Sequence, residues 1–144
     1  MNIQTANSDE SIGKCFLVMK TLRPHLEENS FIPLIKDMAT RGYNLIFIEE
    51  NGQAIAASGY RFAEHLHWGK AIYIDDLSSL PEARGKGYAS ALLDHITGIA
   101  LNNGCNQVHL DSGCNPARYD AHRLYLNHGF NITSFHFAKE VSRK

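Results

Sequence analysis

The pair Asn51-Gly52 constrains the fold of this chain more than any other short segment. It separates two stretches rich in β-forming residues, 43–49 and 53–63. Asparagine and glycine both tolerate the positive φ angles that a tight turn between antiparallel strands requires. A further turn near residues 67–69 leads into a third such stretch, 70–79. The sequence therefore predicts an antiparallel meander of three strands in the middle of the chain.

Other periodic patterns lie on both sides of this meander. They predict a short strand at 3–6, a helix from Ser8 or Asp9 to about Leu22, a second helix from about Ser30 to Thr40, a third at 88–102 that ends before Gly104, a strand at 107–111, a helix with the stripe Ala117, Ala121, Leu124 and His128, and a last strand at 132–138. This order is typical of one layered α/β domain.

Composition argues against several classes of protein. A chain of 144 residues suits one domain with its own apolar core. The formal net charge of -1 and the scattered cations argue against a nucleic-acid partner. The apolar runs fall well short of the roughly 18 residues that span a bilayer, and the N-terminus lacks a secretory pattern, so we expect a cytoplasmic protein without a membrane partner. Cys15, Cys105 and Cys114 lack CxxC spacing, so we expect free, buried thiols.

A glycine-containing loop, Arg84-Gly85-Lys86-Gly87, lies between a predicted strand and a predicted helix. A helix N-terminus presents N–H groups and a positive dipole end to an anion. Glycines let the backbone approach phosphate oxygens because no Cβ intervenes. A dinucleotide fingerprint would need a third glycine near Ser90, and a Walker loop would need Gly-Lys-Ser or Gly-Lys-Thr. The loop predicts a phosphate site, although a surface turn that caps a helix would use the same residues.

Two segments resemble signatures of the GNAT family of N-acetyltransferases. Residues 84–89, RGKGYA, resemble the pattern Gln/Arg-x-x-Gly-x-Gly/Ala, and residues 121–130, AHRLYLNHGF, resemble Ala-x-x-Leu-Tyr-x-x-x-Gly-Phe. Residues 77–82 resemble the strand that enters the first signature, although Ser79 replaces the usual aliphatic residue. The resemblance implies a single N-acetyltransferase domain over residues 1–144, of the α/β (α+β) class, with a central mixed, mostly antiparallel sheet that is splayed at the cofactor site and flanked by helices.

The resemblance also implies acetyl-CoA or a related acyl-CoA as co-substrate; separately, the spacing of the histidines leads us to expect no metal. Family members hold the pyrophosphate on the loop and the pantetheine arm along the preceding strand, with the thioester near Leu77. A backbone N–H aimed at the thioester carbonyl would stabilise the oxyanion formed when an amine attacks. The implied cofactor-binding residues are Leu77, Ser78, Ser79, Arg84, Gly85, Lys86, Gly87, Tyr88, Ala89 and Ser90.

Tyr125, within the second signature, is the candidate general acid. A phenol within hydrogen-bond reach can protonate the thiolate that leaves the tetrahedral intermediate. Packing on the apolar side of the last helix is the alternative role for this tyrosine. Tyr119 lies outside the signature position and is a weaker candidate.

Asp75 is the candidate that accepts a proton from, or pairs with, the acceptor ammonium. Several small-amine acetyltransferases carry an acidic residue at the matching position, and Asp76 is the next candidate. The alternative is that both carboxylates are structural and bind backbone N–H groups or an arginine such as Arg118 or Arg123.

The eight histidines do not follow a metal-binding pattern. His65 and His67 lie beside a predicted turn, and His122 and His128 are six residues apart, which places them on different faces of a helix. No role is assigned to three further polar residues that could line the substrate end of neighbouring strands: His109, Asp111 and His136.

The predicted function is acyl-CoA-dependent N-acyl transfer, with acetyl transfer to a primary amine by direct attack as the leading hypothesis. A non-catalytic CoA-binding regulatory or scaffold domain is the alternative. The acceptor is left open between a small molecule and a protein amine, and so is the existence of a homodimer. Candidates for acceptor contacts are Arg23, His25, Tyr60 and Arg61.

Overall fold

The computed structural model describes residues 1–143, which form two compact units divided after Leu110. The first unit contains β1 (Ile3–Thr5), α1 (Asp9–Lys14), α2 (Phe16–Leu22), α3 (Glu28–Ala39), β2 (Asn44–Glu50), β3 (Gln53–His65), β4 (Gly69–Ser79), the 3₁₀ turn η1 (Pro81–Ala83), α4 (Tyr88–Asn102) and β5 (Gln107–Leu110). The second contains the 3₁₀ turn η2 (Pro116–Arg118) and α5 (Tyr119–Asn127). The assignment of residues 1–144 to one domain stays a prediction.

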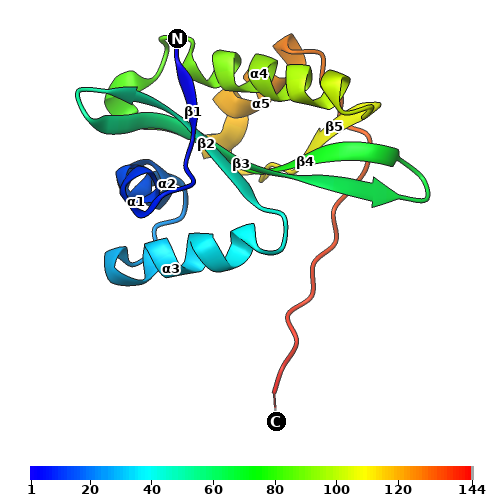
Figure 1. Cartoon of the computed structure of the whole chain (residues 1–144). Helices are drawn as coiled ribbons and strands as arrows, with labels where there is room; N and C mark the ends of the chain where they lie inside the picture. Colours follow the sequence, from blue (N-terminus) through cyan, green and yellow to red (C-terminus); the bar gives the residue numbers. More distant parts are fainter. Residues whose placement is uncertain (144) are drawn as a thin grey trace. The chain divides into compact units, whose positions relative to one another are not determined.

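The first unit is built on a five-stranded mixed sheet with the order β1-β2-β3-β4-β5 (Figure 1). Neighbouring strands are antiparallel except for the parallel pair β4 and β5. The turn between β2 and β3 has positive φ at Asn51 and Gly52, 53° and 78°. The predicted meander is therefore confirmed, and so is the predicted fold class of a mixed, mostly antiparallel sheet flanked by helices.

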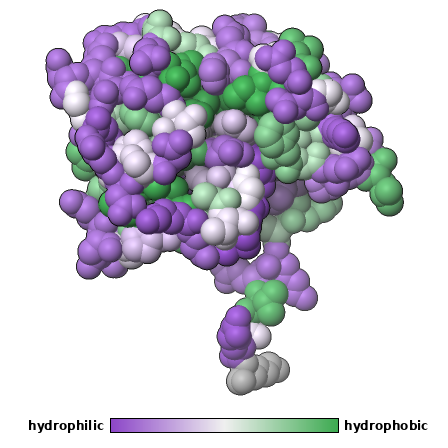
Figure 2. Space-filling view, viewed as in Figure 1, coloured by the Kyte–Doolittle hydropathy of each residue, from purple (hydrophilic) through white to green (hydrophobic). Residues whose placement is uncertain are grey.

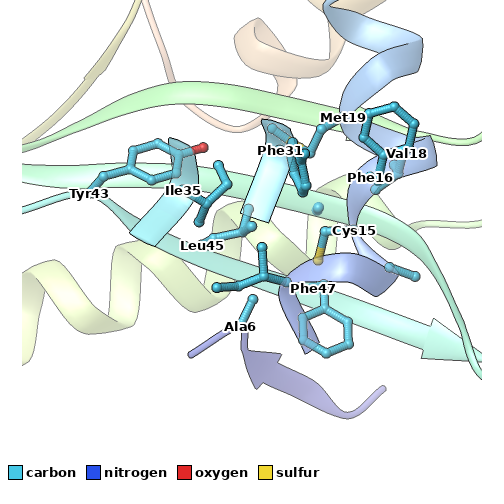
Figure 3. Close-up of a cluster of buried hydrophobic side chains, with 13 residues drawn as sticks. Ala6, Cys15, Phe16, Val18, Met19, Phe31, Ile35, Tyr43, Leu45 and Phe47 are labelled. Carbon is cyan, nitrogen blue, oxygen red and sulfur yellow. The ribbon is translucent and has the colours of Figure 1, made fainter. Parts of the chain in front are cut away.

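Helices cover both faces of this sheet: α1, α2 and α3 lie on one face and α4 on the other (Figure 1). Side chains alternate along β2, so Leu45 and Phe47 enter the core beneath α1 to α3, while Ile46 and Ile48 point to the opposite face. Figure 3 shows the first of these cores. Burial on both faces explains why β2 reads as a continuous apolar run. The α4 residues buried in the structure are Leu92, Leu93, Ile96 and Ala100.

The predicted helix from Ser8 to Leu22 is in fact two helices that meet at Cys15. Ser8 caps the first, as expected, because its side chain accepts a hydrogen bond from the Ser11 N–H at 3.1 Å. The Cys15 N–H then donates to Ile12 O at 3.0 Å, while Cys15 Sγ donates to Ser11 O at 3.5 Å. The Cys15 thiol therefore donates to the Ser11 carbonyl, which in a continuous helix would accept the Cys15 backbone N–H.

The prediction of a last strand at 132–138 is wrong. Residues 130–143 contain no helix or strand, and Ile132, Phe135 and Phe137 are more than four-fifths exposed. A strand forms only where its N–H and C=O groups meet those of a neighbour, and the alternation of apolar residues does not reveal whether a neighbour exists.

All three cysteines are free thiols, but only Cys15 is buried, so the expectation of buried thiols is wrong for Cys105 and Cys114. Burial raises the pKa of Cys15 to about 12, against the smaller opposite effect of Lys14.

Hydrophilic side chains predominate on the face of the molecule that Figure 2 shows. Over residues 1–143, no helix has the length and apolar character needed to cross a membrane.

Candidate functional site

The glycine loop leads directly into α4 and has the backbone that its sequence predicted. Gly85 and Gly87 have φ of 78° and 85°, which favour glycine. Gly87 is the N-cap of α4 and supplies no side-chain cap. A Cβ at Gly85 would meet no described atom within 4 Å, and one at Gly87 would meet only Met1 Cε, at 3.9 Å. The space above both glycines is therefore open.

The surroundings of this helix end favour an anion. The first intrahelical bond runs from the Ala91 N–H to Gly87 O at 3.0 Å, so the N–H groups before it belong to the positive end of the helix. Arg84 and Lys86 are exposed, and the first turn of α4 holds no acidic residue. The Tyr88 hydroxyl donates a hydrogen bond to Glu50 Oε1 at 2.5 Å.

The strand before the loop has an edge that its neighbour covers only in part. β5 pairs with β4 from Ala71 to Ile74, whereas β4 continues to Ser79. On the other side, β3 pairs with β4 as far as Ser79. The sheet of the first unit therefore opens along residues 75–79 of β4, which include the predicted pantetheine contacts Leu77, Ser78 and Ser79.

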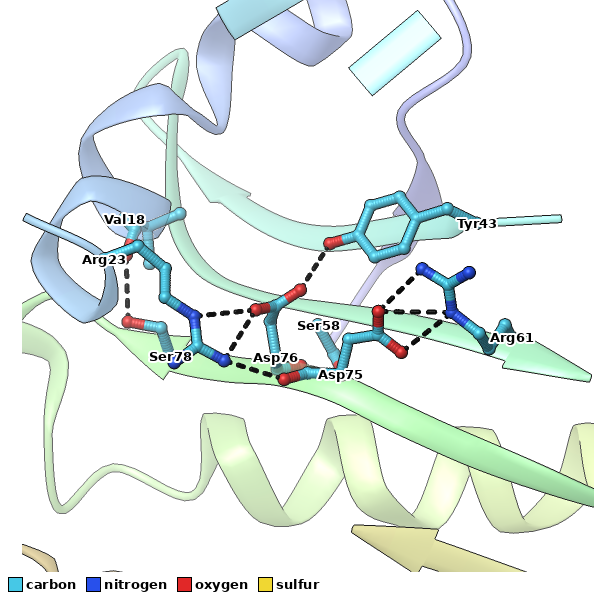
Figure 4. A network of polar contacts seen from close by, with 8 residues as sticks. All are labelled: Val18, Arg23, Tyr43, Ser58, Arg61, Asp75, Asp76 and Ser78. Atoms are coloured by element: carbon cyan, nitrogen blue, oxygen red, sulfur yellow. Dashed lines mark hydrogen bonds and ion pairs between the residues drawn. The ribbon is translucent and has the colours of Figure 1, made fainter. Parts of the chain in front are cut away.

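A β-bulge lies where this opening begins. Gly59 is opposite Asp76 and Tyr60 is opposite Ile74, so Asp75 is the extra residue of β4. A bulge places two successive side chains on one face of a sheet. Figure 4 shows both carboxylates on the face that bears Tyr43 and Arg61.

Asp76 is held by three side chains. Its Oδ1 accepts from Arg23 Nε at 3.0 Å and its Oδ2 from Tyr43 Oη at 2.7 Å, and its backbone carbonyl accepts from Ser58 Oγ at 2.7 Å (Figure 4). Its side chain is only 13% exposed. These contacts fix Asp76 in place and leave it little access to a ligand.

Asp75 forms a two-pronged ion pair with Arg61. Arg61 Nε and Nη2 lie 3.0 Å and 2.7 Å from Asp75 Oδ1 and Oδ2. The side chain of Arg61 is 34% exposed and that of Asp75 is 22% exposed, so a ligand can reach both more easily than Asp76. Arg61 Cζ also lies 5.6 Å from the centre of the Tyr43 ring.

These contacts agree with the alternative in which arginines hold the two carboxylates, but the arginines are Arg61 and Arg23. Arg118 donates to Ser112 Oγ at 3.4 Å, and Arg123 pairs with Asp120 at 2.8 Å. Two of the four candidates for acceptor contacts, Arg23 and Arg61, are therefore paired with these carboxylates. Of the other two, Tyr60 is buried against Phe62, and His25 is exposed.

Tyr43 and Gly59 belong to this cluster and were not predicted from the sequence. A Cβ at Gly59 would overlap the Tyr43 hydroxyl, so glycine makes room for the phenol. Burial, followed by the charge of Asp76, raises the pKa of Tyr43, so the phenol stays protonated and can donate. A glycine inside a predicted strand is itself a signal of such a close approach.

We expect Gly59→Ala to destabilise the protein by about 1–3 kcal/mol, the usual cost of overpacking a filled site. The added methyl group would push Tyr43 away from Asp76. Gly98→Ala, in α4, is the control: its Cβ meets no described atom within 4 Å, so alanine should stabilise by about 0.5–1 kcal/mol. Urea unfolding of both variants measures the difference, and equal midpoints would refute the close approach.

Tyr125, the predicted general acid, lies in α5 of the second unit. It is 8% exposed, and its ring packs edge-on to Phe130 with the centroids 5.9 Å apart. Burial raises its pKa, while Arg118 acts in the opposite direction. Tyr125 is therefore protonated at neutral pH, as a general acid must be. Tyr119 is 48% exposed.

The histidines have partners that explain most of them without a metal. Trp68 stacks on His109 at 3.5 Å and also touches His65 and His67. His122 Nε2 lies 2.8 Å from Gly113 O. His136 lies 3.5 Å from Asp111. Over residues 1–143, no group of His, Cys, Asp and Glu residues is arranged to hold a metal ion.

Known proteins resemble the chain in sequence and in fold. A sequence model of the acetyltransferase (GNAT) family matches residues 12–130. The "Uncharacterized N-acetyltransferase YhdJ" of Bacillus subtilis is 30% identical and covers 98% of this chain and 99% of its own. The aminoalkylphosphonate N-acetyltransferase of Salmonella typhimurium is 33% identical over 63% of this chain and 58% of its own. The structure of AAC(6')-Iy in complex with the bisubstrate analogue CoA-S-monomethyl-acetylneamine shares the fold, with a TM-score of 0.82, 14% identity and coverage of 99% and 98% of the two chains.

Proposed function

Since this chain belongs to the acetyltransferase (GNAT) family and is an N-acetyltransferase by class, we propose that it transfers an acetyl group from acetyl-CoA to a primary amine. The observation that carries the proposal is the open loop at Gly85 and Gly87, at the start of α4. Its backbone N–H groups, with the helix dipole, suit a doubly charged pyrophosphate. A relative in fold, AAC(6')-Iy, binds a CoA-containing analogue, which supports the same donor here.

The pantetheine arm of the donor would lie along the open edge of β4. Residues 77–79 extend past the end of β5, and an extended amide chain can add to a sheet edge through main-chain hydrogen bonds. This contact would bring the thioester beside Leu77. A backbone N–H of this stretch would then stabilise the oxyanion of the intermediate.

The reaction is a direct attack. The acceptor ammonium first gives one proton to Asp75 or, through water, to solvent, because only the neutral amine has a lone pair. The amine nitrogen then bonds to the thioester carbon and gives a tetrahedral intermediate. The C–S bond then breaks, sulfur leaves with the electron pair, and the phenol of Tyr125 gives its proton to that sulfur. The amine proton released to solvent balances the one that Tyr125 regains. The products are an N-acetyl amide and CoA.

Asp75 would be the charge partner of the incoming ammonium. Its side chain is more exposed than that of Asp76 and lies at the start of the open edge of β4. A carboxylate that an arginine already orients offers its remaining lone pairs in a fixed direction.

A free-thiol assay with acetyl-CoA and a panel of amines tests the activity. We expect CoA release that depends on the amine. The alternative, a CoA-binding scaffold, predicts thermal stabilisation by acetyl-CoA with no release beyond the rate of hydrolysis.

We expect Asp75→Asn to lower kcat/KM for the acceptor by about tenfold or more, while the affinity for acetyl-CoA stays within twofold of the parent. The amide keeps the size of the side chain but loses the charge that pairs with ammonium. Asp120→Asn, in an exposed pair with Arg123, serves as the control. A stability loss with normal acceptor kinetics on the folded protein would make Asp75 structural only.

A further inference from the structure

The polar cluster on β4 carries no net charge. It contains two carboxylates, Asp75 and Asp76, and two guanidinium groups, Arg61 and Arg23, joined pairwise at 2.7 Å and 3.0 Å (Figure 4). A ligand that enters such a partly buried cluster is most stable when it leaves the charge balanced, because an uncompensated charge there is poorly solvated. The balance of this cluster therefore bears on which amines can bind beside Asp75.

An amine whose only charge is its ammonium would give the cluster a net positive charge. Its ammonium would gain Asp75 but would also lie close to Arg61, which holds both oxygens of the same carboxylate. Like charges at this range disfavour a simple cation.

Arg61 has donors left for a second anion. A guanidinium carries five N–H donors, and Asp75 is held through Nε and Nη2 only. The edge formed by Nη1 and Nη2 has the geometry that binds a carboxylate or a phosphonate through two parallel hydrogen bonds. An anionic group of the acceptor can thus bind Arg61 without displacing Asp75.

Tyr43 helps to orient Arg61 for binding an anionic group. The guanidinium lies over the Tyr43 ring, and the Tyr43 hydroxyl is fixed by Asp76 at 2.7 Å in the space left by Gly59. A planar guanidinium that lies over a ring and is paired with a carboxylate keeps its donors oriented, so less entropy is lost when a ligand binds.

We infer that the acceptor is a zwitterion: a primary amine whose carbon chain also carries an anionic group, either a carboxylate or a phosphonate. The ammonium pairs with Asp75 and the anionic group with Arg61, so the cluster stays neutral. This inference rests on the proposed function, because it concerns the amine-binding part of the same site. The Salmonella relative is named for an aminoalkylphosphonate, an acceptor of this charge pattern.

Calorimetry on the CoA-loaded protein tests the inference without turnover. The probes are β-alanine, γ-aminobutyrate and aminoethylphosphonate. Each is compared with an amine in which an uncharged group replaces the anionic one: β-alaninamide, γ-aminobutyramide and propylamine. We expect the zwitterions to bind at least about tenfold more tightly, the scale of one hydrogen bond between charged groups. A preference for the phosphonate or for the carboxylates identifies the anion. Equal binding of the zwitterions and of the cations that lack the anionic group overturns the inference.

Arg61→Gln separates this role from a structural one. We expect it to lower the affinity for the zwitterions by about tenfold to hundredfold and to leave that for propylamine unchanged or improved. Arg61→Lys should restore part of the loss, because it keeps the charge without the fork. Arg123→Gln, which breaks an exposed ion pair, is the control. An equal loss for all amines overturns the inference, and so does no loss. Absence of thiol release with intact zwitterion binding would count against the proposed acetyl transfer alone.

Discussion

Gly87→Ala is expected to reduce the affinity for CoA by about a hundredfold. The methyl group would occupy space that phosphate oxygens need, and the backbone would leave the φ of 85° that aims the N–H groups at the ligand. Loss of one or two hydrogen bonds to a charged group accounts for a change of this size. Isothermal titration calorimetry with CoA measures it directly.

Gly104→Ala is the matched control, because Gly104 follows the other end of the same helix. Its φ is 71°, and a Cβ there would meet no described atom within 4 Å, as at Gly85. Both substitutions should therefore cost about 1–2 kcal/mol of stability through backbone strain. Only Gly87→Ala should lose CoA. Equal CoA affinity in the two folded variants would show that the pyrophosphate lies elsewhere.

Tyr125→Phe is expected to lower kcat by about 10²-fold while acetyl-CoA binds as before. The substitution removes a proton donor whose pKa burial has raised, and it leaves the ring free to keep its contact with Phe130. Removal of a positioned general acid commonly has an effect of this size. Single-turnover measurement of thiol release follows the chemical step itself.

Tyr119→Phe controls for the loss of a phenol in the same helix, since Tyr119 is half exposed. It should retain normal turnover. If Tyr125→Phe also turns over normally when chemistry limits the rate, Tyr125 serves packing alone, and the thiolate must leave unprotonated or take its proton from another donor.

Features set by neighbouring residues could be predicted from the sequence. Asn51 and Gly52 turn the chain because both tolerate positive φ, and α4 begins at Tyr88 and ends at Asn102 as its apolar spacing predicted. The glycines of the loop, Gly85 and Gly87, have the positive φ that favours glycine. In each case the relevant energies act within one turn or one helix, so the local sequence contains them.

Features that depend on distant partners were decided only by the tertiary structure. The register between β3 and β4 makes Asp75 the extra residue of a β-bulge. The partner of Asp75, Arg61, lies fourteen residues earlier in the chain, and the partner of Asp76, Arg23, lies fifty-three residues earlier. The alternating residues 132–138 form no strand, and the helix predicted from Ser8 to Leu22 is divided at Cys15. Sequence by itself determined the turn at Asn51 and Gly52, the bounds of α4, the fold class and the backbone of the glycine loop. Tertiary structure decided which side chains hold the carboxylates, because the energy of a side-chain pair depends on a distance that only the folded chain sets.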